Sequence, residues 1–90
     1  MNVRVEIDDD DDRILAIYIT LGDGKVSRTV EIDPGVCNVD ENEHGRLLGV
    51  EILSTQHGDV ARSVAQVTER YPSEAGLRNL LDSAIGRVAV

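Results

Sequence analysis

The chain has 90 residues, of which 17 are acidic and nine are basic, so its formal net charge is −8 at pH 7. A chain of this length forms one domain, which we assign to residues 1–90, and its core must be aliphatic because Phe and Trp are absent. No apolar run is long enough to span a bilayer, and a single cysteine cannot form an intrachain disulfide. We therefore expect a cytoplasmic protein.

The negative charge is unevenly distributed along the chain. The whole excess lies in residues 1–53, whereas acidic and basic side chains balance over residues 54–90. An acidic surface repels phosphate groups and attracts basic protein surfaces. We therefore expect a protein partner, with no direct binding to nucleic acid and no membrane association.

Apolar and polar residues alternate with a period of two as far as residue 53, and this pattern predicts five β-strands. They cover residues 2–7, 13–21, 25–33, 36–40 and 46–53. The second strand is apolar on both faces, which indicates a central position in the sheet. Because consecutive strands are usually neighbours, the simplest topology is an antiparallel β-meander.

The segments between these strands carry turn signals. Gly22-Asp23-Gly24 tolerates positive φ angles and predicts a chain reversal before the third strand. Pro34-Gly35 fits the centre of a type II turn, whose twist suits tight hairpins poorly. We therefore expect a wider corner or a β-bulge after the third strand.

Beyond Ser54 the apolar period becomes that of an α-helix. Val60, Val64, Val67 and Tyr71 form one stripe of a helix of about 14 residues. Asp59 is the expected N-cap, with Ser54 or Thr55 as alternatives, and Pro72 ends the helix. Ser73 then caps a second helix. Its apolar side comprises Leu77, Leu80, Leu81, Ala84, Ile85 and Val88. The fold class is therefore α+β, and the two helices pack either on the sheet or on a partner subunit.

Two blocks of sequence resemble a known family. They are R-T-x-E-x-D-P-G-V at residues 28–36 and G-R-x-x-G-x-E-I-L at residues 45–53. With the strands before them they make residues 3–53 similar to short bacterial and phage proteins catalogued as domain of unknown function 2283. The resemblance implies no catalytic residues, and at most an antitoxin-like or other interaction role.

The chain departs from that family pattern in two places. Residues 36–45 are one residue longer than usual and carry Asn38 and Asp40 where apolar residues are common, so we expect the fourth strand to be an edge. The helical extension after Ser54 lies outside the resemblance.

The side chains that could carry chemistry do not form a recognisable site. Asp8–Asp12 could hold Ca²⁺ or Mg²⁺, but the run lacks the alternating ligands and the glycine of a calcium loop, so a solvated hairpin loop is favoured. His44, His57 and Cys37 have no zinc or catalytic spacing. Both histidines fit surface positions, and Cys37 fits a small buried side chain. We expect no enzymatic activity, no cofactor and no metal.

Three functions remain open. The first is a non-enzymatic interaction protein, antitoxin-like or a phage or host modulator, that forms a homodimer. Its interaction face would be the apolar remainder of the sheet, which we assign to Ile14, Ala16, Tyr18, Cys37, Leu47 and Leu53. The second is an acidic DNA mimic that occupies the basic groove of a nucleic-acid-binding protein. The third, a small enzyme, would need a histidine to converge with carboxylates in a pocket.

Overall fold

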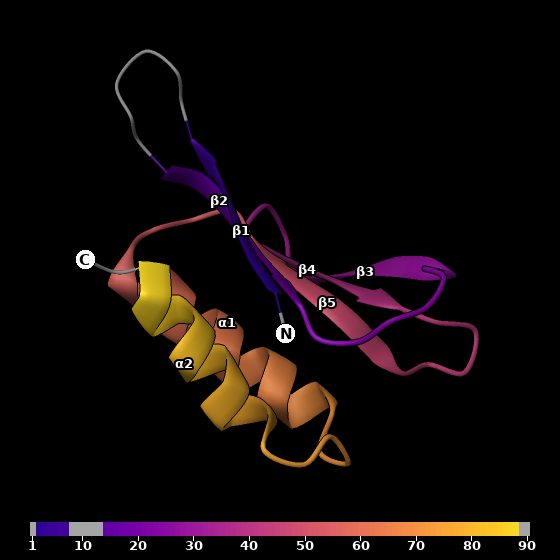
Figure 1. Ribbon diagram of the computed structural model, residues 1–90. Coiled ribbons are helices and arrows are strands. Elements are labelled where there is room, and N and C mark those ends of the chain that lie inside the picture. Colours follow the sequence, from indigo (N-terminus) through magenta and orange to yellow (C-terminus); the bar gives the residue numbers. More distant parts are fainter. Residues whose placement is uncertain (1, 8–13, 89–90) are drawn as a thin grey trace.

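The computed structural model describes residues 2–7 and 14–88. Five strands form one antiparallel sheet: β1 (Asn2–Ile7), β2 (Ile14–Thr20), β3 (Arg28–Asp33), β4 (Cys37–Glu41) and β5 (Leu47–Ile52). Two helices follow, α1 (His57–Arg70) and α2 (Leu77–Val88), and both lie on the same face of the sheet (Figure 1). The predicted α+β fold, with five antiparallel strands and two C-terminal helices, is confirmed.

The order of the strands differs from the predicted meander. The observed order is β1-β2-β5-β4-β3, so β5 lies between β2 and β4. Residues 21–27 do not reverse the chain into a hairpin with β2. They pass the end of β5, where the N–H groups of Leu21 and Gly22 donate to the carbonyl of Leu48 at 2.8 and 3.2 Å. The chain thereby reaches the far edge of the sheet before β3 begins.

The expectation that the fourth strand is an edge is also wrong. Strand β4 is paired on both sides, and β3 takes the edge position instead. Asn38 and Asp40 suit an internal strand because they point away from the helices and form hydrogen bonds with side chains on β2, β3 and β5. The polar residues Asn38 and Asp40 therefore indicate that one face of β4 is uncovered, and not that β4 is an edge strand.

The hairpin between β3 and β4 has the expected bulge. Gly35 adopts a φ of 75°, and the N–H of Val36 donates to the carbonyl of Asp33 at 2.9 Å, as in a type II turn. The register shifts between Glu31 and Asp33. The shift means that β3 has one more residue than β4 at this point, which is a β-bulge. The bulge makes the type II turn compatible with the twist of the two strands.

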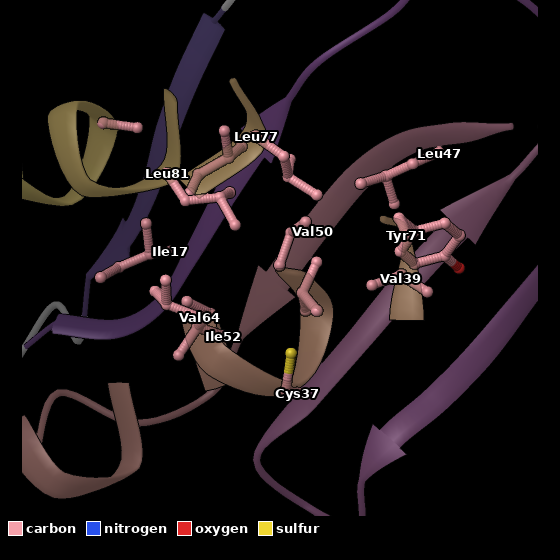
Figure 2. Packing of buried hydrophobic residues seen from close by; sticks show 13 residues of the cluster. Ile17, Cys37, Val39, Leu47, Val50, Ile52, Val64, Tyr71, Leu77 and Leu81 are labelled. Carbon is pink, nitrogen blue, oxygen red and sulfur yellow. The ribbon is translucent and has the colours of Figure 1, made fainter. Parts of the chain in front are cut away.

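The core lies between the helices and one face of the sheet. Ile19, Val39 and Ile52 from the strands meet Val67 and Leu81 from the helices, and each is at most 1% exposed. Figure 2 shows Val39, Ile52 and Leu81 within this packing. Both helices therefore pack on the sheet of their own chain. The stripe expected on α1 faces this core, whereas Leu80 of the stripe expected on α2 is 43% exposed.

The starts of both helices differ from the predictions. Gln56 is the N-cap of α1 and forms no capping bond with its side chain, while Asp59 lies inside the first turn. Ser54 connects the segment before α1 with the first turn of the helix. Its hydroxyl accepts from the N–H of Gln56 and donates to Asp59 at 2.7 Å. A carboxylate in the first turn stabilises a helix without capping it. Helix α2 begins at Leu77, too late for Ser73 to be its cap.

Candidate functional site: the uncovered sheet face

The face of the sheet opposite the helices is polar. Side chains alternate along each strand, so the residues between the core positions point to this side. One row of paired residues crosses all five strands. It consists of Arg4, Tyr18, Glu51, Asn38 and Glu31. We call the surface formed by this row and the neighbouring row the open face. The neighbouring row consists of Asn2, Thr20, Gly49, Asp40 and Thr29.

The open face carries excess negative charge. Its two rows contain the carboxylates Glu31, Asp40 and Glu51 against one guanidinium, Arg4. Glu6, opposite Ala16 on the same side of the sheet, adds another exposed carboxylate. Such a surface attracts cationic groups and repels a second copy of itself.

Tyr18 occupies the centre of the open face. Its ring leans over Gly49 of β5, and its hydroxyl donates to Asp40 on β4. The guanidinium of Arg4 lies over the ring, 5.0 Å from its centroid. Burial, followed by the hydrogen bond to Asp40, raises the pKa of Tyr18 to about 12. The hydroxyl is therefore a neutral donor at physiological pH, unsuited to act as a base.

Hydrogen bonds between strands hold the carboxylates of the open face in place. Asp40 accepts from Tyr18 and from the hydroxyl of Thr29, the latter at 2.6 Å. The amide of Asn38 donates to Glu51 at 3.4 Å. Side chains fixed in this way lose less rotamer freedom when a partner binds. The open face is thus a pre-ordered acidic surface around one aromatic ring.

The apolar interaction face expected from the sequence does not form. Cys37 and Leu47 lie in the core beneath the helices, at 0% and 6% exposure. Cys37 shares the inward side of β4 with Val39, and the bulge between Asp40 and Glu41 turns Leu47 inward, opposite Glu41. Ala16 is buried and Leu53 is 39% exposed. Only Tyr18 of the expected set has a central place on the open face.

Two sequence predictions fall outside the part of the chain that the structure describes. These are the side chain of Ile14 and the Asp8–Asp12 loop with its candidate cation site.

Cys37 sits against α1 as a buried thiol. Burial raises its pKa to about 11, and a hydrogen bond with Ser63 offsets part of that effect. A thiol that stays protonated is a poor nucleophile. This agrees with the interpretation of Cys37 as a small core side chain.

The histidines do not converge with other reactive groups. His44 lies exposed in the loop between β4 and β5, 3.4 Å from Glu43, and His57 is exposed at the start of α1. Within residues 2–7 and 14–88, no three His, Cys, Asp or Glu side chains are grouped to hold a metal ion.

Sequence reasoning missed a buried carboxylate between the sheet and α1. Glu41 is 3% exposed, and it accepts hydrogen bonds from the hydroxyl of Tyr71 and, at 2.5 Å, from Nε of Arg28. The Tyr71 bond, with Arg28 behind it, holds the pKa of Glu41 below its ordinary value despite burial. The signal in the sequence was that Glu41 continues the inward-facing series of Cys37 and Val39 in β4, so that a buried carboxylate could have been expected there. The cluster links β3 and β4 to Tyr71, the C-cap of α1.

A shallow cleft opens at one end of the molecule. The linker after β2, the β4–β5 loop and the start of α2 surround it, with Leu48, Leu77 and Leu80 on its apolar side. Arg46 and Glu74 form an ion pair of 3.4 Å at its rim.

A family model described as "Protein of unknown function (DUF2283)" matches residues 4–55. This segment contains nearly the whole sheet and the open face, and it ends before α1. Neither the curated proteins nor the solved structures gave a match. None of the described helices is long and apolar enough to cross a membrane.

Proposed function

The chain belongs to the DUF2283 family of proteins of unknown function, and from this premise we propose a role based on its own surface. We propose that it is a non-enzymatic protein that binds a basic protein partner through the open face. The carrying observation is a sheet face left bare by both helices, with a fixed aromatic ring among carboxylates.

The composition of the open face supports a protein partner. Tyrosine is favoured in protein interfaces because its ring offers apolar contact area and its hydroxyl a polar handle. Arg4 and Asp40 already orient Tyr18. A partner with lysine or arginine side chains would be steered by Glu6, Glu31 and Glu51 and would then pack on the ring.

If the role is antitoxin-like, the expected partner is small and positively charged. A small basic toxin-like protein would complement the net charge of −8. Binding would depend on salt, because exposed charge pairs are screened at higher ionic strength. A phage or host modulator would use the same face on a larger basic target.

An acidic DNA mimic is the second candidate. The observation in its favour is that carboxylates occupy adjacent rows on one face. A mimic would compete with duplex DNA for the basic groove of its target, whereas an ordinary protein partner would not respond to added duplex.

A capture experiment with charge-reversal variants tests the proposal. The double variant Glu6→Lys/Glu51→Lys changes the open face, and Glu43→Lys/Asp82→Lys changes the net charge equally elsewhere. We expect the wild type and the second variant to retain one basic protein from host lysate and the first variant to lose it. Retention by the first variant would contradict the proposal. Release by added duplex would favour the DNA mimic.

A further inference from the structure

Strand β3 forms one edge of the sheet. It pairs with β4 alone among the described residues, so one row of its backbone N–H and C=O groups faces outward. Thr29 and Arg28 on this strand are exposed. An open edge of this kind is a template for another strand.

The residues along this edge complement themselves in an antiparallel pairing. If two copies pair about Thr29, Val26 of one copy comes opposite Ile32 of the other, and Ser27 comes opposite Glu31. Val26 is 46% exposed in the single chain, and pairing would cover it. Lys25 would lie beside the acidic end of the opposite strand. The N–H of Ser27 donates to the carbonyl of Glu41 at 2.8 Å, so the chain already follows β4 at that point.

The neighbouring register is less suitable. Pairing about Val30 would place Pro34 opposite Val26, and proline has no N–H to donate to the ladder. It would also leave Lys25 opposite Gly35, with no charge to meet. A register centred between two residues would set side chains of opposite faces against each other. The pairing about Thr29 therefore fits the sequence best.

A cleft between β3 and α1 adds an independent observation. Glu31, Ile32, Gln66, Glu69 and Arg70 line it. The side-chain oxygen of Gln66 is buried there and has no hydrogen-bond partner among the described residues. A buried acceptor without a donor is costly. A polar side chain of a second copy docked along β3 would supply the missing donor.

Helix α1 flanks the pairing edge. Among the described strands it lies closest to β3, and Arg62 on α1 pairs with Asp33 of β3 at 2.9 Å. In the paired arrangement the two α1 helices therefore come close to each other beside the joined strands.

We propose that two copies of this chain form an isologous dimer by antiparallel pairing of their β3 edges about Thr29. The two sheets join into one of ten strands, with all four helices on one side and both open faces on the other. The dimer does not depend on the proposed basic partner, and its test uses the purified chain alone.

A cysteine at the symmetry axis gives the sharpest test. In the proposed dimer the two Thr29 Cα atoms lie about 4.5–5.5 Å apart, within the range of a disulfide. Thr29→Cys should therefore form a covalent dimer on oxidation. Glu31→Cys is the matched control, because its Cα atoms would be more than about 7 Å apart. Wild-type Cys37 is fully buried and should not cross-link.

Light scattering at micromolar concentration completes the test. We expect a dimer for the wild type, weakened about tenfold or more by Val26→Asp and unchanged by Leu80→Asp, an equally exposed apolar side chain elsewhere. A monomeric wild type would overturn the proposal. So would cross-linking through residue 31 in place of residue 29, or a dimer indifferent to Val26→Asp.

Discussion

Gly49 and Tyr18 determine the geometry of the open face at the scale of single residues. A Cβ at position 49 would lie 2.9 Å from Cζ of Tyr18, closer than packed carbon atoms approach. The glycine thus leaves the space in which the ring crosses β5 to reach Asp40. The backbone there needs no unusual φ, so the requirement is space alone.

Gly49→Ala should displace the Tyr18 ring. We expect the free energy of unfolding to fall by about 1–3 kcal/mol, as for overpacked sites. The pKa of Tyr18 should move from about 12 towards 10 as the ring becomes less buried and its bond to Asp40 is lost. Denaturant unfolding and tyrosinate absorbance measure the two effects. Gly58→Ala is the control, since nothing lies within 4 Å of its Cβ. If both variants unfold alike, the close approach is not significant.

The buried Glu41 makes stability depend on acid pH. Its folded pKa is lowered by Tyr71 and Arg28, so its contribution to stability is present above its ordinary value of 4.5. That contribution is lost as pH falls below 4.5 through the folded pKa. The unfolded chain takes up the proton first, which favours unfolding.

Glu41→Gln should remove this pH dependence. At pH 7 we expect the variant to be less stable than the wild type by about 1–3 kcal/mol, because charged hydrogen bonds are replaced by neutral ones. The difference should shrink as pH falls below 4.5, measured by urea unfolding at several pH values. Asp59→Asn provides a comparison at a less buried carboxylate whose pKa is also lowered. A gap that stays constant with pH would contradict the assignment.

At the scale of elements, local signals decide the hairpins and the helices. Gly35 and Gly45 adopt φ angles of 75° and 77° at the turns beside β4, and Asn42 fixes the second turn by accepting from the N–H groups of His44 and Arg46. Gly86 in α2 has no such requirement, and nothing lies within 4 Å of its Cβ. Its cost in the helix is only that of glycine flexibility.

Gly35→Ala and Gly86→Ala should therefore act in opposite directions. We expect the first to lower the free energy of unfolding by about 1 kcal/mol, because alanine is strained at positive φ. The second should raise it by up to about 1 kcal/mol through helix propensity. Thermal unfolding of the two variants beside the wild type gives both values. Destabilisation by Gly86→Ala would mean that α2 is not a helix at that point.

The same local signals explain what could be predicted. The β3–β4 turn and its bulge follow from Pro34-Gly35, and the stripe of α1 follows from Val60, Val64 and Val67. Local pattern could not supply the order of the strands, because the pairing of β2 with β5 joins residues more than 28 positions apart. In the structure, nearly all residues of β5 are buried, as expected for a strand in the middle of the sheet. The start of α1 was missed because Ser54 and Asp59 bond each other.

The whole molecule has two unlike sides. Both helices lie on one side of the sheet (Figure 1), with the apolar core beneath them. The open face with its carboxylates occupies the other side. The sequence showed the charge excess of residues 1–53 but not its arrangement, because that depends on the strand order. It also suggested an apolar second face that included Leu47, which turns inward only through the bulge between Asp40 and Glu41.

The central claim is that the open face is the binding surface, and amide chemical shifts test it most directly. The labelled chain would be titrated with the captured basic partner. We predict that the shifts concentrate at Tyr18, Asn38 and Glu51 and weaken with added salt. Shifts confined to α1 and α2, with these three amides unchanged at saturation, would contradict the claim.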